Sequence, residues 1–372
     1  MRRSVPCGRL NETRERSFGA RPAVAAPEAH ILRIDPRASI VDGAPVLTTV
    51  LELVQNKRMS DVTSLVRSAC ARVAARARHV SIDREAIPAY AAGLPLAARG
   101  AARAAGPDPQ AHLTTGSEEE LAAFWLTLDA INFGSGWFPT LRKRPGRSGY
   151  YTVATGVRER FAAAGPWHAR ELARIGAHEV ATVLGQDPAH ELMALFARSL
   201  NDLGRHVEND HGGEFRGVAQ SAKSSAVALA GQLAGWDCFA DVSSYDGFAV
   251  PFYKRAQLAA ADLGDAGVAR WHDRDRLTMF ADNLVPHVLR LDGILRFAPD
   301  LLARIGNGEL VEHGSPEEVE IRACALHAVE LIVAARPPGT TSAVEVDRLL
   351  WSRGGGPSYK SAPRHRSRCT AY

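Results

Sequence analysis

The sequence predicts a mainly α-helical protein, built as a single multi-helix domain with few short strands. From Val46 onward, apolar residues recur at three- and four-residue spacing through most of the chain, which is the pattern of amphipathic helices. Alternation of apolar and polar residues, which is typical of a half-buried strand, is scarce. We therefore expect packed helices around one core.

The N-terminal part divides into an arm and the start of the helical domain. Residues 1–44 are rich in Arg, Ala and Pro without a clear period, so we expect a loosely ordered arm before a domain of residues 45–372. Helices are predicted from Val46 and from Asp61, where the aspartate is placed to cap the helix. Ser117, followed by three glutamates, predicts the capped start of another helix.

The middle of the chain is predicted to be helical over three segments. Residues 168–185 have a helical period and end at a glycine, and residues 218–236 are rich in small residues that allow close packing. Residues 187–207 contain Gly204, which we expect to weaken or kink that helix. The segment 149–157, GYYTVATGV, is the best candidate for a short strand or hairpin.

Composition excludes several classes of protein. The net charge of +4 does not demand a nucleic-acid polymer as partner. No apolar run approaches the ~20 residues that span a membrane, and the N-terminus lacks the apolar core of a signal peptide. The five cysteines stand singly, without a CxxC pair, so we expect a reduced, cytoplasmic protein. Neither a metal-binding spacing nor a phosphate-binding glycine loop is present, and we expect no metal and no cofactor.

The segment 250–286 carries the most informative pattern. Lys254 and Arg255 open an amphipathic helix, where they could meet an anionic group or form a solvated charged face. Asp282 follows an apolar run in LTMFAD, and a carboxylate there is costly unless it is paired or used in chemistry. It could equally cap the next helix, and capping is compatible with catalysis. If the segment is helical, Asp275 shares a face with Asp282, and the two carboxyls could have different pKa values.

Residues 128–139, LDAINFGSGWFP, place aromatic side chains and an amide at a helix end and in a glycine-rich loop. Asn132, Phe133 and Trp137 suit a flat heterocycle, which binds by stacking and by hydrogen bonds to its edges. A helix end packed by its own aromatics is the alternative interpretation. Tyr150 is a further candidate for binding the same heterocycle.

The terminal residues 363–372 alternate cations with small residues. In an extended chain, Arg366 and Arg368 lie on one side and could hold a phosphate. A frayed basic terminus is the alternative interpretation. His365 and Tyr372 belong to the same segment and are also candidates for substrate binding.

Together, these segments resemble the queuosine salvage protein family. The resemblance covers about residues 46–372, and its motifs follow the family order. Family members resemble NFCFW where this chain has NFGSGWFP, and they usually end with an aromatic pair where this chain ends in Thr-Ala-Tyr. The matching stretches are LTLDAINFGSGWFP, VPFYKRAQLAAADL, LTMFADNLVP, EEVEIRACALHAVELI and RHRSRCTAY.

The resemblance implies a fold similar to helix-hairpin-helix DNA glycosylases, in which a catalytic aspartate follows a hairpin and a helix. The turn at Tyr245, the helix with Lys254, and Asp282 stand in that order. The implied reaction is hydrolysis of the N-glycosidic bond of queuosine 5′-phosphate, a small-molecule substrate, which releases queuine for tRNA queuosine salvage and ribose 5-phosphate. The implied catalytic residues are Asp282, Asp275 and Lys254. The implied substrate-binding residues are Asn132, Phe133, Trp137, Tyr150, Asp241, Tyr245, His365, Arg366, Arg368 and Tyr372.

The implied roles follow the chemistry of the bond. Asp282 would stabilise positive charge on the ribose, and Lys254 with the tail cations would hold the 5′-phosphate or orient Asp282. The alternative function is a nucleic-acid-binding or base-excision module of the same fold that acts on a flipped base. That function predicts a broad basic face, which the net charge of +4 disfavours. We expect neither a nucleic-acid polymer nor a membrane as partner, and the sequence leaves the oligomeric state open.

Overall fold

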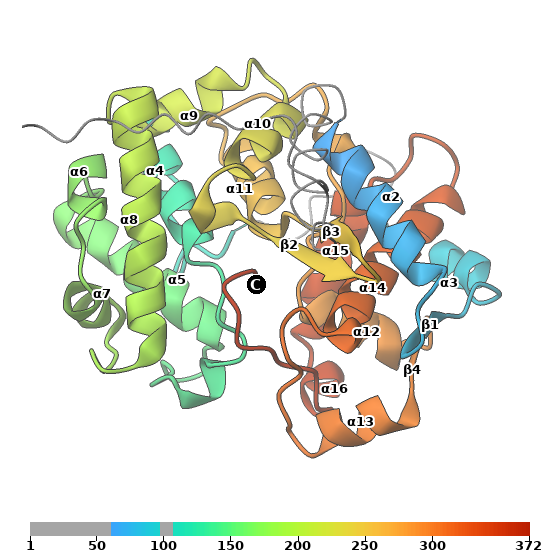
Figure 1. Ribbon diagram of the computed structural model, residues 1–372. Helices are drawn as coiled ribbons and strands as arrows, with labels where there is room; N and C mark the ends of the chain where they lie inside the picture. The colour runs from blue at the N-terminus through green and yellow to red at the C-terminus, as the bar shows by residue number, and fades with distance from the viewer. Residues whose placement is uncertain (1–60, 97–106) are drawn as a thin grey trace, which may run out of the picture. The chain divides into compact units, whose positions relative to one another are not determined.

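The protein is described by a computed structural model that covers residues 61–96 and 107–372. This part of the chain is mainly helical with two small sheets (Figure 1), which confirms the predicted fold class. The predicted arm 1–44 and the helix predicted from Val46 lie outside the described residues. Within the described ranges, no helix is both long and apolar enough to cross a bilayer.

The helices follow one another closely along the chain. The first group is α2 (Val62–Ala74), α3 (Ile87–Gly93), α4 (Glu118–Ala130), η1 (Phe138–Thr140), α5 (Gly149–Ala164), α6 (Ala169–Leu172), α7 (Ala177–Leu184), α8 (Glu191–His211) and α9 (Phe215–Ser221). The second group is α10 (Ala226–Leu233), η2 (Asp237–Phe239), α11 (Lys254–Asp265), η3 (Arg274–Arg276), α12 (Leu284–Leu291), α13 (Pro299–Gly306), α14 (Pro316–Ala334), α15 (Ala343–Gly354) and α16 (Pro357–Lys360).

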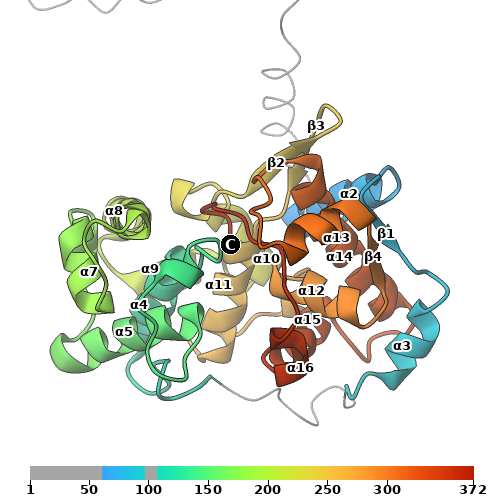
Figure 2. The same ribbon diagram turned by 90° about the horizontal axis from the view of Figure 1, so that it is seen from below.

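The strands form two separate antiparallel pairs (Figure 2). One pair joins β1 (Val80–Ile82) to the distant β4 (Leu295–Phe297), with Ser81 opposite Arg296. The other is a hairpin of β2 (Val242–Tyr245) and β3 (Phe248–Pro251). This hairpin precedes α11 directly, in the order that the helix-hairpin-helix resemblance implies.

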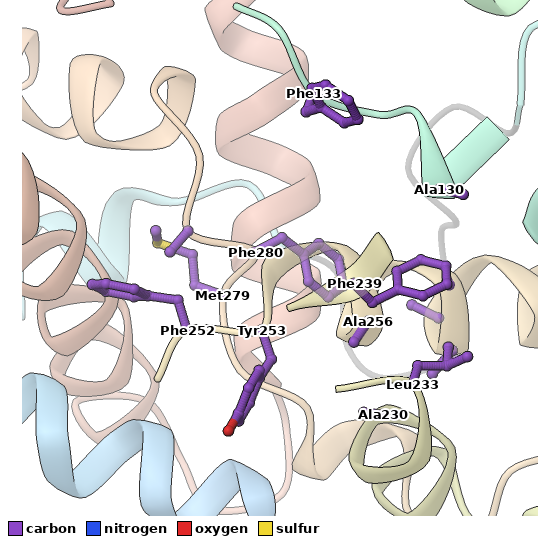
Figure 3. Packing of buried hydrophobic residues seen from close by; sticks show 14 of the residues in the cluster. Ala130, Phe133, Ala230, Leu233, Phe239, Phe252, Tyr253, Ala256, Met279 and Phe280 are labelled. Carbon is purple, nitrogen blue, oxygen red and sulfur yellow. The ribbon is translucent and has the colours of Figure 1, made fainter. Parts of the chain in front are cut away.

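Helix α14 lies at the centre of the core. It packs against α2, α3, α12 and α15, and buried residues occur on every side of it. A helix that is buried all round is typical of the core of a large domain. A second layer is formed by α11, which packs between α10 and α4. Figure 3 shows Phe252, Met279 and Phe280 in the core, where the start of α11 meets the segment that leads to α12.

Local capping signals are confirmed. Asp61 accepts a hydrogen bond from the Thr63 backbone N–H at 2.8 Å, at the start of α2. Ser117 and Glu120 form a reciprocal capping box at the start of α4. Gly185 ends α7 with a φ of +65°, a left-handed conformation that glycine adopts without steric cost.

The strand predicted at residues 149–157 is wrong, because this segment forms the first half of α5. Ser148 caps the helix by accepting from the Tyr151 N–H at 3.2 Å, and Val153 and Val157 are buried on one helical face. The cap and the packing therefore outweigh the preference of Tyr, Thr and Val for strands.

Two of the long predicted helices are each divided. Residues 168–185 form α6 and α7, because Asn201 donates its amide to the carbonyls of Leu172 (2.7 Å) and Ile175 (3.0 Å) and so satisfies the end of α6. Residues 218–236 are interrupted where Lys223 and Ser224 adopt φ of +49° and +66°.

Helix α8, in contrast, runs through Gly204 unbroken. A Cβ at Gly204 would lie 2.3 Å from the Ala173 backbone nitrogen. The glycine therefore lets α8 pack closely on α6 and does not interrupt the helix.

Candidate active site

The β2–β3 hairpin positions the first residue of α11. Asp246 and Gly247 form its turn with φ of +44° and +79°, as a type I′ hairpin turn requires. After β3, Tyr253 also has a positive φ of +51°, which turns the chain sharply into the helix. Lys254 therefore points into the protein from the N-terminal end of α11, where it is only 6% exposed.

Lys254 is a buried cation, so the solvated charged face considered for it is wrong. Its Nζ donates to the Asn132 carbonyl at 3.1 Å, and its backbone N–H donates to Asp241 at 2.9 Å. Burial lowers the pKa of Lys254, while the charges of Asp282 and Asp129 act in the opposite direction. The structure thus brings Lys254, Asn132 and Asp282 together from three separate segments.

Asp282 lies half-buried at the start of α12. Its Oδ1 accepts from the backbone N–H groups of Leu284 (2.8 Å) and Val285 (3.1 Å), which confirms the predicted capping role. These two bonds hold the carboxylate in one orientation. The adjacent residue Asn283 is buried and donates its amide to the carbonyl of His365 in the terminal segment at 3.1 Å.

Two further buried carboxyls interact electrostatically with Asp282 or Lys254. Asp347 of α15 is buried and accepts from the Phe280 N–H at 3.0 Å. Burial, reinforced by the charge of Asp282, raises the pKa of Asp347 well above its ordinary value. Burial and the charge of Asp262 likewise raise the pKa of Asp129. Both carboxyls are therefore biased toward the neutral form, which can donate a hydrogen bond.

Asp129, in the last turn of α4, connects this group to the loop that follows. Its Oδ1 accepts weakly from the Asn132 amide at 3.4 Å, and its buried Oδ2 has no hydrogen-bond partner within the described ranges. Asn132 therefore bridges Asp129 and Lys254, with its amide on one and its carbonyl on the other.

The aromatic residues predicted to bind the base have different packing partners. Phe133 is buried, packs edge-on against Phe196 at 5.0 Å and lies beneath the Arg255 guanidinium. Trp137 is also buried, and its Nε1 donates to Glu191 at 2.8 Å. For these two residues, the contacts fit the alternative of a helix end packed by its own aromatics.

Tyr150 belongs to a different aromatic group. Its hydroxyl lies 2.9 Å from His112 Nε2, and its ring meets the Trp351 ring edge-on at 5.9 Å. Burial raises the pKa of Tyr150 well above its ordinary value, and the charges of Asp262 and Asp129 reinforce the shift. Tyr150 therefore lies near the carboxyls of Asp262 and Asp129.

The terminal segment is ordered against the core, so the frayed terminus considered for it is wrong. From Arg364 to Ala371, half-buried or exposed residues alternate with buried ones, as in an extended chain with one face inward. Arg255 donates to the Thr370 carbonyl at 2.6 Å, and the Gly134 N–H donates to the Tyr372 carbonyl at 3.0 Å. Figures 1 and 2 both show this segment ending beside α11 and the loop after α4.

The predicted binding residues of this segment occupy different environments. Arg366 donates to the Gly308 carbonyl at 3.1 Å, and Arg368 lies 3.9 Å from Glu191. His365 and Tyr372 point inward and are almost fully buried, and His365 Nε2 has no hydrogen-bond partner within the described ranges.

Of the remaining predicted residues, Tyr245 and Asp275 lie outside the group around Lys254. Asp241 helps to hold that group, because it accepts the Lys254 backbone N–H. Tyr245 donates to the buried Glu320 at 2.7 Å, and Asp241 is the buried partner of Arg322. Asp275 is exposed and lines a polar surface depression. The chain from 277 to 282 is not helical, so the shared helical face proposed for Asp275 and Asp282 does not exist. The depression is lined by Trp271, His272, Arg274, Asp275, Ser342 and Glu345.

Sequence reasoning did not single out Asp347 and Arg364, whose pKa values are both affected by the charge of Asp282. Asp347 looks like an ordinary polar residue of a helix, and only packing brings it to Phe280. Arg364 shares the alternation that singled out Arg366 and Arg368, so the same periodicity would have found it. Within the described ranges, no group of three or more His, Cys, Asp and Glu side chains is arranged to hold a metal ion.

Comparison with known proteins gives a consistent result. The sequence pattern of the family described as "Queuosine salvage protein" matches residues 111–372. A relative from Sphaerobacter thermophilus is 34% identical over 315 residues, which is 81% of this chain and 95% of the relative. One from Mus musculus is 29% identical over 327 residues, 81% of this chain and 96% of the relative. Both relatives are named queuosine 5′-phosphate N-glycosylase/hydrolase.

Proposed function

The chain belongs to the queuosine salvage protein family, and we propose that it hydrolyses the N-glycosidic bond of queuosine 5′-phosphate. The products are queuine and ribose 5-phosphate. The observation that carries this proposal is the oriented carboxylate of Asp282 beside the buried cation Lys254, within a chain that matches the family over residues 111–372.

Asp282 supplies the main electrostatic contribution in this mechanism. As the C1′–N bond breaks, its electron pair leaves with the base and positive charge develops on C1′ and the ring oxygen. The Asp282 carboxylate, held by the Leu284 and Val285 N–H groups, stabilises that charge without reorganising. It also aligns the water that adds to C1′ and accepts a proton from it, and net transfer of this proton to the departing base leaves neutral queuine and an Asp282 carboxylate.

Lys254 supplies a fixed positive charge near the Asp282 carboxylate. Its own Nζ is fixed by the Asn132 carbonyl, so its charge stays near Asp282 throughout the reaction. A buried cation acts more strongly on a nearby carboxylate than an exposed one, because little solvent screens the interaction.

The leaving base requires a hydrogen-bond donor, because a 7-deazaguanine has no N7 to protonate. We assign this role to Asp347, which is biased toward the protonated form and lies within the electrostatic reach of Asp282. A carboxylic acid kept neutral by its surroundings is an effective donor at neutral pH.

The reaction fits a small-molecule substrate in the cytoplasm. Cys70, Cys238, Cys324 and Cys369 are free thiols, which is typical of a reducing compartment. The net charge of +4 does not favour a nucleic-acid polymer as the substrate.

The test is direct incubation of the purified protein with queuosine 5′-phosphate, followed by mass spectrometry. We expect free queuine and ribose 5-phosphate in equal amounts. No release above a protein-free control, under conditions where a curated relative is active, would contradict the proposed function.

A further inference from the structure

We infer that Arg364 binds the 5′-phosphate of the substrate and so sets the preference for the nucleotide over the nucleoside. This inference rests on the proposed function and deepens it. It moves the expected phosphate contact from Arg366 and Arg368 to a residue that the terminal segment holds beside Asp282.

The backbone on both sides of Arg364 is attached to the start of α12. Arg290 donates to the Pro363 carbonyl at 3.1 Å, and Asn283 donates to the His365 carbonyl at 3.1 Å. Asn283 directly follows Asp282 in the chain. Because consecutive Cα atoms are about 3.8 Å apart, these two bonds fix the Arg364 backbone next to the catalytic carboxylate.

Arg364 differs from the two neighbouring arginines in its partners. The Arg366 guanidinium donates to the Gly308 carbonyl, and Arg368 lies 3.9 Å from Glu191 and over the Trp137 ring. Arg364 makes no hydrogen bond or ion pair with any residue within 61–96 or 107–372. Arg364 is half-buried, and the five N–H donors of its guanidinium have no protein acceptor among those residues.

Asp282 is not a hydrogen-bond acceptor for Arg364. Its Oδ1 accepts two backbone N–H groups, and the Asp282 carboxylate forms no ion pair with Arg364. The two charges nevertheless interact, because Asp282 opposes the lowering of the Arg364 pKa by burial. Arg364 is therefore close enough to Asp282 for their charges to interact, and its guanidinium N–H groups remain available to a ligand.

A phosphate monoester fits this arrangement chemically. It carries close to two negative charges at neutral pH, and a guanidinium can bind two of its oxygens at once. In a nucleotide, the 5′-phosphate is joined to the same ribose whose C1′ faces Asp282. Arg364 would also offset the repulsion between the phosphate and the Asp282 carboxylate.

The test compares Arg364→Gln with the control Arg270→Gln, at an exposed arginine, using both queuosine 5′-phosphate and queuosine. For Arg364→Gln, we expect kcat/KM for the nucleotide to fall roughly 10- to 100-fold, as for loss of a charge-assisted hydrogen bond, while kcat/KM for queuosine changes little. Inhibition by ribose 5-phosphate should weaken by a similar factor. Arg270→Gln should resemble wild type on both substrates.

A positioning role gives a different result. If Arg364 only orients Asp282, both substrates lose the same factor, and that outcome would overturn the inference while leaving the proposed function intact. Wild type that cleaves neither substrate would overturn the proposed function and the inference with it. Arg364→Lys, which keeps the charge but not the paired donors, should retain part of the nucleotide preference. Thermal unfolding of each variant separates a folding defect from a binding defect.

Discussion

Arg322 and Asp241 form a buried ion pair with two hydrogen bonds, of 3.0 and 2.7 Å. The same Asp241 carboxylate accepts the Lys254 backbone N–H at 2.9 Å. The Arg322 guanidinium also lies over the rings of Phe252, at 3.9 Å, and Tyr372, at 4.7 Å. A single side chain of α14 thus joins the start of α11 to the terminal segment.

Breaking this pair should be strongly destabilising. Arg322→Met leaves the Asp241 charge buried without its partner, so we expect unfolding free energy to fall by about 3–5 kcal/mol. Arg304→Met, which removes the partly exposed partner of Glu317, should cost only about 0–1 kcal/mol. Chemical denaturation measures both, and similar losses for the two variants would contradict the structural role of the pair.

Asp282→Asn tests the proposed catalytic role of the Asp282 carboxylate. The amide oxygen can still accept from Leu284 and Val285, so the fold should be retained, but the amide cannot balance positive charge on the ribose. We expect kcat/KM to fall by about 10²–10³-fold or more. Asp300→Asn, which changes an exposed carboxylate on α13, should leave kcat/KM unchanged. A folded Asp282→Asn variant with near wild-type turnover would refute the assignment.

Lys254 should produce the alkaline limb of the pH profile. Its pKa is lowered by burial, so the protonated form is present at low and neutral pH and is lost as pH rises through a value below that of an ordinary lysine. We expect kcat/KM to decline in that range.

The Lys254→Met variant should have low activity and lack this limb. Lys143→Met, at an exposed position, should keep both the activity and the limb. An alkaline limb that persists unchanged in Lys254→Met would assign it to another group.

Gly136→Ala tests whether the terminal segment must lie against the loop after α4. The added Cβ would lie 2.4 Å from the Ser367 carbonyl oxygen, so the backbone of one segment must move. We expect a loss of about 1–3 kcal/mol in stability and a lower kcat/KM. Gly93→Ala, whose Cβ would meet no atom within 4 Å, is the matched control. Equal behaviour of the two variants would argue against this packing.

Removal of metal should leave activity unchanged. The proposed mechanism uses the Asp282 carboxylate and fixed hydrogen-bond donors, and no step needs a Lewis acid. We expect full activity after exhaustive dialysis against EDTA, with the metal content of the protein measured in parallel. Activity that is lost and then restored by Ca²⁺, Mg²⁺ or Zn²⁺ would favour a metal-dependent hydrolase mechanism.

Local features of the sequence determined much of the helical structure. The caps at Asp61 and Ser117 and the stop at Gly185 are read from neighbouring residues, because a cap satisfies backbone groups within its own turn. The cap formed by Asp282 was predicted for the same reason. The helix at 149–157 was not, because its strand-favouring residues are overruled by burial against distant helices.

Tertiary structure alone decided which charges are buried and what they meet. Lys254 and Asn132 are 122 positions apart, and Asp241 and Arg322 are 81 apart. The periodicity of a sequence contains no information on contacts over such separations. From the sequence, Lys254 therefore fitted a surface residue as well as a catalytic one. The sequence by itself determined the residue types and their order. The packing of α11, α12 and the terminal segment decided that Asp282 lies near Lys254 and that Arg364 lies beside Asp282, because desolvation and pairing depend on what surrounds a charge in three dimensions.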